Sequence, residues 1–175
     1  MYMDTSIFIS KNFKPKEGRI ACESPSNIAL IKYWGKYGLQ FPINPSLSFT
    51  LSNCKTETSI EYSPRLKGQD NFDFLYDGKA KKSFENKIEE FFERISLFCP
   101  YLENLFLKIN SKNTFPHSSG IASSASAFSS LAFCIVSIEK RFNEKMTEQN
   151  FFNKVSFLAR LGSGSGSRSI SGPLM

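Results

Sequence analysis

Pro116-His-Ser-Ser-Gly-Ile-Ala-Ser-Ser-Ala125 is a loop of small residues that runs directly into a helix predicted over 124–141. Small side chains allow a ligand to approach the backbone closely. The first turn of a helix has free N–H groups and a partial positive charge, and both attract an anion. The loop is not a Walker A sequence, because no Gly-Lys-Ser/Thr ends it. It indicates either a phosphate-binding loop or an ordinary helix-capping loop.

A second unusual loop is Gly162-Ser-Gly-Ser-Gly-Ser-Arg168, which follows a helix predicted over 148–161. A glycine–serine run taken alone indicates a flexible linker. Here the run leads to a single arginine, and its N–H groups and hydroxyls could surround a diphosphate. The Arg168 guanidinium could bind a carboxylate or a phosphate through two parallel hydrogen bonds. Both interpretations stay open on these residues alone.

The third unusual segment is Asn27-Ile-Ala-Leu-Ile-Lys-Tyr-Trp-Gly-Lys36, which holds the only tryptophan of the chain. Lys32 and Lys36 lie among apolar residues, and this setting fits an anionic substrate better than a solvated run of charge. The alternative is a β-strand whose lysines extend along its apolar surface to reach solvent.

The remaining segments predict an α+β domain over residues 19–175, after an irregular and loose lead-in over 1–18. Alternating apolar and polar residues predict strands, which fall at 19–23, 46–52, 57–63, 70–77 and 104–110. Residues 53–56 are expected to form the turn of a hairpin. Strands followed by a helix, a strand and two further helices favour α+β over a repeating βαβ sheet.

Helical spacing of apolar residues predicts helices over 83–98, 124–141 and 148–161. Ser83 is expected to cap the first helix, and Pro100 is expected to stop it. The 18 phenylalanines fall mostly in these periodic stretches, so we interpret them as core residues rather than as a stacking surface.

Length and composition limit the class of protein. The 175 residues suit one domain, and a hydrophobic content of 41% excludes a wholly disordered chain. The net charge of +6 fits an anionic ligand, but the basic residues are spread out, which argues against nucleic acid. Four scattered cysteines and one histidine argue against a disulfide framework or a zinc site. No apolar run reaches the roughly 18 residues of a membrane span and no signal peptide is evident, so we expect a cytoplasmic protein.

Taken together, NIALIKYWGK, PHSSGIASSASAF and ARLGSGSGSRS, in this order, resemble the diphosphomevalonate decarboxylases. FPINPSLSFTL (41–51) resembles the decarboxylase segment that follows KYWGK. This family belongs to the superfamily of small-molecule kinases that includes galactokinase, homoserine kinase and mevalonate kinase. The resemblance covers nearly the whole chain and implies the ribosomal protein S5 domain 2-like fold of the superfamily's N-terminal domain.

The resemblance implies an ATP-dependent decarboxylation of mevalonate 5-diphosphate to isopentenyl diphosphate, a step of isoprenoid biosynthesis, with ATP as co-substrate and Mg²⁺. ATP phosphorylates the tertiary 3-hydroxyl, and the phosphate then leaves as carbon dioxide is lost. Such a site needs an ATP cradle, magnesium, cations for the diphosphate and a group aimed at the carboxylate. Full-length members are expected to form homodimers.

The resemblance also implies roles for individual residues. The catalytic set is Lys32, which could balance the transferring charge, Ser124 near the phosphates, and Arg168, which orients the carboxylate. The substrate-binding set is Tyr33, Trp34, Gly35, Lys36, Ser163, Gly164, Ser165, Gly166, Ser167 and Arg168. The ATP-binding set is Pro116, Ser118, Ser119, Gly120, Ile121, Ala122, Ser123, Ser124 and Ala125. No residue is assigned as a metal ligand.

The sequence departs from the family pattern in three places. Gly166-Ser167 replaces the usual Ala-Cys, and His117-Ser-Ser119 replaces the usual Thr-Ala-Ala, where His117 is interpreted as a loop residue. Family members exceed 300 residues and carry, in a C-terminal domain, the aspartate that acts on the 3-hydroxyl. The last aspartate here is Asp77. We therefore expect an incomplete N-terminal portion with exposed apolar surface, whose C-terminal half is either lost or separately encoded.

Two alternative functions remain. One is a related decarboxylase or 3-kinase that acts on mevalonate 5-phosphate or mevalonate, although Lys36 and the Ser163–Ser165 loop favour the diphosphate. The other is a catalytically inactive remnant with residual nucleotide binding, which the missing aspartate favours.

Overall fold

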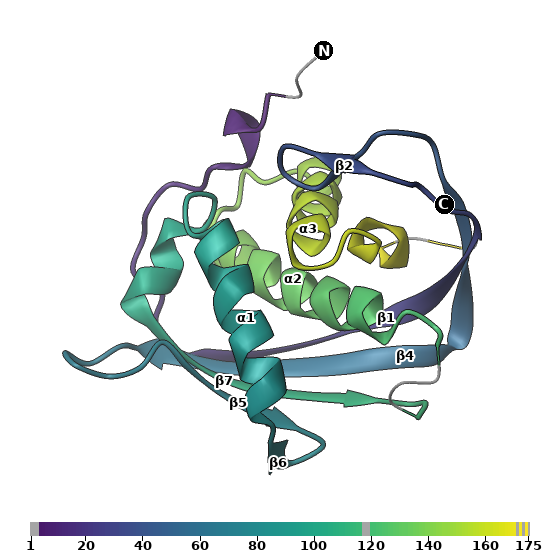
Figure 1. The fold of residues 1–175 in the computed structure, drawn as a ribbon. Helices are drawn as coiled ribbons and strands as arrows, with labels where there is room; N and C mark the ends of the chain where they lie inside the picture. The colour runs from purple at the N-terminus through teal and green to yellow at the C-terminus, as the bar shows by residue number, and fades with distance from the viewer. Residues whose placement is uncertain (1–3, 117–119, 171, 173, 175) are drawn as a thin grey trace.

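The computed structural model describes residues 4–116, 120–170, 172 and 174, and it places a mixed β-sheet beneath a layer of helices (Figure 1). The five strands of the sheet lie in the order β1-β4-β7-β5-β6. Their bounds are β1 Gly18–Ile31, β4 Leu47–Pro64, β7 Leu105–Asn113, β5 Phe72–Tyr76 and β6 Lys79–Ala80. Neighbouring strands are antiparallel, except β5 and β7, which are parallel. A separate ribbon pairs β2 (Lys36–Tyr37) with β3 (Phe41–Pro42).

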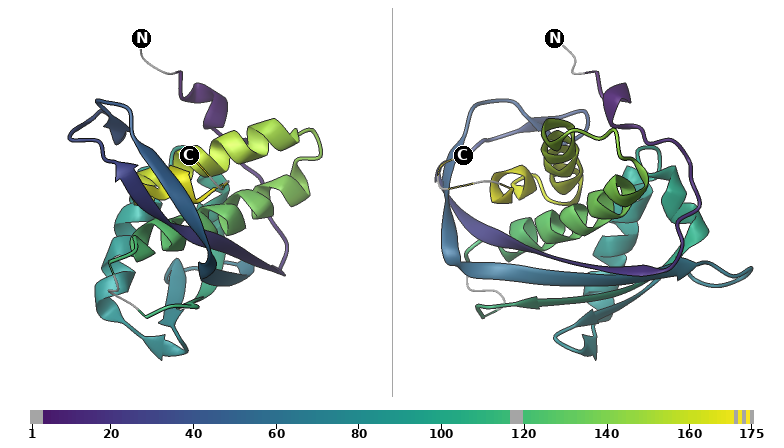
Figure 2. Two further views of the ribbon diagram at one scale, coloured as in Figure 1. Left: turned by 90° about the vertical axis from the view of Figure 1, so that its right-hand side faces the viewer. Right: turned by 180° about the vertical axis from the view of Figure 1, so that it is seen from behind.

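The helices all lie on one face of the sheet (Figure 2). They are α1 Lys82–Ile95, α2 Ser123–Phe142 and α3 Glu148–Gly162, with short 3-10 helices η1 Ser6–Phe8, η2 Pro100–Asn104 and η3 Gly166–Ser169. Helix α2 packs on β1 and β4, and α3 packs on α2. Thr147 caps α3, because its side chain accepts a hydrogen bond from the Asn150 N–H at 3.2 Å. The predicted α+β class is confirmed.

The two faces of the sheet differ because side chains alternate along each strand. Ile60 and Ile109 point toward the helices and are buried. On the opposite face, charged residues form a row across four strands: Arg19 lies opposite Glu61, Glu61 opposite Lys108, and Lys108 opposite Asp73. Opposite charges at facing positions stabilise the pairing of the strands. This face of the sheet is therefore suited to contact with solvent.

Aromatic rings fill much of the core, as the sequence predicts. Phe91 of α1 packs against Phe128 of α2, with ring centroids 5.2 Å apart. In contrast to the core, several large apolar side chains are exposed to solvent around the end of β1 and in the segment that follows it. Leu30, Ile31 and Trp34 are 61%, 56% and 89% exposed. The expected apolar surface where a second domain would pack stays a prediction.

The predicted hairpin between 46–52 and 57–63 does not form, because both segments belong to the single strand β4. The register between β1 and β4 shifts at Pro25/Ser26, and residues 53–56 lie at this irregularity. Proline has no N–H to donate, so it is tolerated on an edge strand or at a bulge. The polar residues predicted to be a turn instead accommodate a bulge in a long, bent strand.

Two details of the first helix were predicted wrongly. Helix α1 begins one residue before Ser83, so Ser83 lies inside its first turn and cannot cap it, and the N-cap residue Lys81 makes no capping hydrogen bond with its side chain. The helix ends at Ile95 rather than Phe98, and beyond it the Ser96 and Phe98 N–H groups bond to carbonyls three residues back, so the chain tightens into turns ahead of the proline.

The lead-in expected to be loose over residues 1–18 is fastened to the domain, from residue 4 onward. The Phe8 ring stacks on Phe157 of α3 at 4.6 Å. The Ser10 N–H donates to the Phe98 carbonyl at 3.0 Å. Burial of Phe8 gives this irregular segment an apolar anchor that its polar composition does not suggest.

All four cysteines carry free thiols. In the described part of the chain, no helix combines the length and the apolar character needed to cross a membrane.

Candidate active site

The loop before α2 adopts a conformation that leaves the start of the helix open. Gly120 and Ala122 both have positive φ angles, of 78° and 53°. Ala122 is the N-cap residue and has no polar side chain with which to cap the helix. The buried Ser26 hydroxyl of β1 donates to the Ile121 carbonyl and so anchors the loop to the sheet. Residues 117–119, which include the predicted Ser118 and Ser119, lie outside the described residues.

The first turn of α2 lies beside the glycine–serine loop. Ser124 is exposed, and its hydroxyl oxygen is 3.4 Å from the hydroxyl oxygen of Ser163. Deeper in the helix, the Ser129 hydroxyl donates to the Gly166 carbonyl at 2.7 Å. Two of the three segments that the sequence singles out are therefore in contact.

The glycine–serine run is not a flexible linker. It folds into η3, where Ser167, Arg168 and Ser169 are buried. The Asn27 side chain of β1 donates to the Ser169 hydroxyl at 2.8 Å. Gly166 is required by close approach, because a Cβ there would collide with the Ala159 carbonyl oxygen of α3. The linker interpretation is thereby excluded.

The third segment also reaches this loop. A side chain at Gly164 would collide with the Tyr33 hydroxyl and the Lys36 ammonium, so both polar groups lie against the loop backbone. The Arg168 guanidinium stacks over the Tyr33 ring at 5.1 Å from its centroid. The Lys36 Nζ donates to Gln40 Oε1 at 2.7 Å, which holds the lysine without neutralising it. Tyr33 and Lys36 thus lie against the loop that leads to Arg168, and the Arg168 guanidinium lies over the Tyr33 ring.

A small cavity of about 210 Å³, here called the cationic cavity, lies beside Tyr33 and Arg168. Tyr33, Ser46, Arg160 and Arg168 are among its lining residues. Burial lowers the pKa of Arg168, and burial together with the nearby Arg168 charge lowers the pKa of Arg160. Neither arginine forms an ion pair with a carboxylate among the described residues. The site therefore presents positive charge inward.

Sequence reasoning missed Arg160. A basic residue in the last turn of a helix is ordinarily explained by the helix dipole, and Arg160 occupies that position in α3. Only its place two residues before the glycine–serine run hints at another role.

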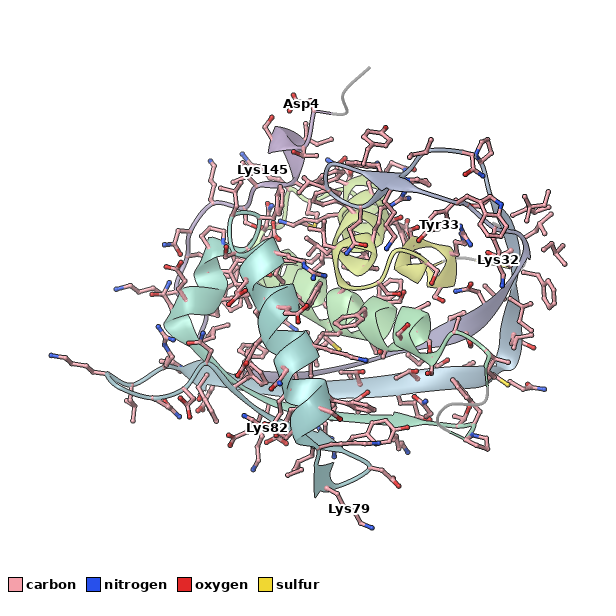
Figure 3. The ribbon with its side chains drawn as sticks, in the orientation of Figure 1. Asp4, Lys32, Tyr33, Lys79, Lys82 and Lys145 are labelled. Atoms are coloured by element: carbon pink, nitrogen blue, oxygen red, sulfur yellow. The ribbon has the colours of Figure 1, made fainter. Side chains whose placement is uncertain are left out.

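Other predicted residues lie outside the cavity. Trp34 is 89% exposed, and Lys32 is exposed with its carbonyl 3.4 Å from Asn44 Nδ2. The Gly35 carbonyl accepts a hydrogen bond from the Ile43 N–H at 3.0 Å, which joins the residue before β2 to the residue after β3. Figure 3 shows Lys32 and Tyr33 on the side of the molecule where η3 lies. Pro116 is exposed ahead of the phosphate-loop segment.

A second, mostly apolar cavity of about 300 Å³ adjoins the start of α2. Ser123 and Ser124 form part of its lining, and Phe74, Ile88, Phe128 and Leu131 supply apolar walls. The cavity lies between α1, α2 and the sheet. The open end of α2 therefore borders an apolar cavity as well as the cationic cavity described above.

The known proteins to which this chain is similar in sequence and fold include diphosphomevalonate decarboxylases. The family model described as diphosphomevalonate decarboxylase-like N-terminal domain matches residues 24–175. The diphosphomevalonate decarboxylase of Aspergillus fumigatus is 32% identical over 169 residues, which cover 88% of this chain and 40% of that relative. The chain thus spans about 40% of the length of the curated relatives it matches.

Solved structures agree. The mevalonate diphosphate decarboxylase of Staphylococcus aureus has a TM-score of 0.72 and 32% identity, over 90% of this chain and 45% of that one. The enzyme from Enterococcus faecalis, described for its mevalonate diphosphate-mediated ATP binding mechanism, has a TM-score of 0.68 and 31% identity, over 90% and 47% of the two chains.

Proposed function

The chain belongs to the family of diphosphomevalonate decarboxylase-like N-terminal domains, and on that premise we propose that it binds ATP and mevalonate 5-diphosphate in the cytoplasm for decarboxylation to isopentenyl diphosphate. One observation carries the proposal: the Ser124 hydroxyl, at the open end of α2, lies 3.4 Å from Ser163 in the loop against which Tyr33 and Lys36 pack. Phosphoryl transfer requires the two substrates to bind side by side.

ATP occupies the end of α2 in this proposal. The free N–H groups of the first turn and the hydroxyls of Ser123 and Ser124 bind the phosphates. The adjoining apolar cavity of about 300 Å³ takes the base, since rings such as Phe128 offer it apolar contact. The phosphates then point toward the cationic cavity.

Magnesium accompanies the nucleotide. Among the described residues, no group of three or more His, Cys, Asp or Glu side chains could hold a metal. The donors that fit are the hydroxyls of Ser123 and Ser124, which suit a hard ion whose other ligands are phosphate oxygens and water. When bound, magnesium neutralises charge on the phosphates.

The substrate occupies the cavity around η3. Lys36 and Tyr33 bind its diphosphate, and the Ser163–Ser165 loop donates further hydrogen bonds. Arg168 binds the carboxylate in two-pronged geometry and holds the breaking carbon–carbon bond in line with the departing phosphate. Lys32 and Trp34 stand at the edge of the site, where Lys32 balances charge on the transferring phosphoryl group.

The base that takes the 3-hydroxyl proton comes from elsewhere. No aspartate or glutamate lines the cationic cavity among the described residues. We propose that the part of the relatives that this chain does not span supplies that carboxylate. The same observation favours a second candidate function, namely a nucleotide-binding remnant without turnover.

Binding and turnover of residues 1–175 test the proposal together. Calorimetry should show binding of a non-hydrolysable ATP analogue and of mevalonate 5-diphosphate, while labelled carbon dioxide release should be absent. Ser124→Ala should weaken the ATP analogue about tenfold, because a hydrogen bond to a charged group is lost. Ser137→Ala, on the same helix but far from its start, is the matched control.

Adding a separately expressed C-terminal half should restore carbon dioxide release. Turnover by the 175-residue chain alone would contradict the placement of the base. Absence of binding to both ligands would contradict the proposed function. Binding of the ATP analogue alone would favour the remnant.

A further inference from the structure

Two guanidinium groups share the cationic cavity, and neither has an acidic partner among the described residues. Arg168 is 9% exposed, and Arg160 is partly buried. Their hydrogen-bond partners are hydroxyls: Arg160 Nη2 donates to Ser167 Oγ at 3.1 Å, and Arg168 donates to Ser46 Oγ. Aromatic faces complete their surroundings, with Phe41 5.6 Å from Arg160 and a tyrosine ring against Arg168.

This arrangement is unfavourable without an anion. Removal of water from a charged group is costly unless a partner replaces the water, and buried charges in proteins are normally paired. Hydroxyls and ring faces replace only part of the lost hydration. Burial is the main cause of the lowered pKa of Arg160, and the positive charge of Arg168 lowers it further. An anion between the two side chains would remove both costs.

The backbone holds the two arginines in this relation. Gly166 packs against the Ala159 carbonyl of α3, a distance that no larger residue permits. That contact brings Ser167 beside α3, where its hydroxyl fixes the Arg160 side chain. Arg160 is therefore held by the same 3-10 helix that carries Arg168.

We propose that Arg160 is a second anion-binding side chain of this site and that, with Arg168, it holds the carboxylate of the substrate between two guanidiniums. The inference rests on the proposed function for the identity of the ligand. Lys36 and Tyr33, which lie against Gly164, take the diphosphate, so the arginine pair is left for the other anionic group. Arg160 thereby makes the site specific for a ligand with a carboxylate.

Calorimetry on the 175-residue chain tests this assignment with two ligands that differ in the carboxylate. Arg160→Gln should weaken mevalonate 5-diphosphate about tenfold or more, and isopentenyl diphosphate by less than about threefold. Ser167→Ala keeps the Arg160 charge but removes the hydroxyl that holds the Arg160 side chain. It should weaken mevalonate 5-diphosphate by a smaller factor, again with little effect on isopentenyl diphosphate. Arg65→Gln, which removes an exposed charge at the far end of β4, is the matched control.

A second measurement separates this proposal from the proposed function. Citrate, a carboxylate anion unrelated to the reaction, should raise the Tm of the wild-type chain more than that of Arg160→Gln. If the chain binds neither diphosphate, the proposed function fails, and the citrate comparison still decides the role of Arg160.

Equal citrate shifts in the wild type and the variant would overturn the assignment, as would unchanged affinity for mevalonate 5-diphosphate. Equal weakening of both diphosphates would overturn the carboxylate assignment. If Arg160→Gln does not fold, the same affinities and citrate shifts are measured on Arg160→Lys and Ser167→Ala. Both variants keep a positive charge at this position and change only how it is held.

Discussion

Helix α3 has two cationic side chains that point into the molecule, Lys154 and Arg160, and they differ in whether a carboxylate pairs with them. Lys154 is 3% exposed and has three oxygen partners: Glu139 Oε2 at 2.8 Å, Ser10 Oγ at 2.5 Å and the Phe98 carbonyl at 3.0 Å. Arg160, in the last turn of the same helix, has a hydroxyl and an aromatic ring. One cation is fully compensated by the fold, and the other is left for a ligand.

The oxygen atoms that pair with the Lys154 ammonium come from other parts of the fold, so this buried charge is stabilised without a ligand. Ser10 belongs to the lead-in, Phe98 follows α1, and Glu139 lies on α2. One ammonium near the middle of α3 therefore joins four parts of the chain. The arginine end of the helix contacts the loops of the site, and the neighbouring Leu161 carbonyl accepts a hydrogen bond from Arg94 of α1 at 3.0 Å, but no carboxylate pairs with Arg160 among the described residues. Burial of a cation alone does not reveal a binding site, whereas burial without a carboxylate partner does.

The largest expected effect is on the compensated cation. Glu139→Ala should lower the free energy of unfolding by about 3–5 kcal/mol, because it leaves Lys154 buried and unpaired. Urea denaturation of the wild type and the variant gives the difference directly. The double variant Glu139→Leu with Lys154→Met should regain most of the loss, since an apolar pair needs no compensation. A loss below about 1 kcal/mol in the single variant would refute the contrast.

Arg168 of η3, which like Arg160 has no carboxylate partner among the described residues, should respond in the reverse sense. Arg168→Lys should weaken mevalonate 5-diphosphate by about tenfold to a hundredfold, because lysine keeps the charge but loses the two-pronged geometry. Affinity for the ATP analogue and the free energy of unfolding should change little. Calorimetry with each ligand and a urea titration check the three quantities. Substrate affinity close to that of the wild type would remove Arg168 from the carboxylate.

The sequence predicted elements better than it predicted the connections between them. Residues 70–77, 104–110, 124–141 and 148–161 each correspond to a strand or helix at nearly the expected bounds. The hairpin at 53–56 failed because local polarity does not distinguish a turn from a bulge, and only the pairing of β4 with β1 decides it.

The site shows the same limit. Arg168 could be predicted because it ends an unusual motif. Arg160 could not, because its significance depends on the contact of Ser167 with α3 and on the absence of a carboxylate partner in the described structure, neither of which a sequence displays. Trp34 was predicted from the same motif as Tyr33, yet its side chain is 89% exposed whereas Tyr33 lines the cavity.

The smallest expected effect is on a thiol that shares the environment of the compensated lysine. Burial raises the pKa of Cys99 from 9.0 to about 12, while the Lys154 charge lowers it and the Glu139 charge raises it by smaller amounts. Burial dominates because the positive charge is already directed at Glu139. A pKa that is higher in the folded state gives stability that is present below pH 9 and is lost as the pH rises toward 12.

At pH 10 the thiol is mostly ionised in the unfolded chain and still protonated in the folded one. The free energy of unfolding should therefore be lower at pH 10 than at pH 8 by about 1 kcal/mol from Cys99. Tyr101, whose pKa burial raises, and Cys134, whose pKa is raised first by its contact with Cys22 and then by burial, add to the loss in the wild type, so the test is a difference between proteins. Cys99→Ala should lose about 1 kcal/mol less than the wild type between these two pH values. Cys54→Ala, which leaves Cys99 in place, should keep the full loss, and identical pH dependence in all three proteins would show that Cys99 ionises as readily in the folded chain as in the unfolded one.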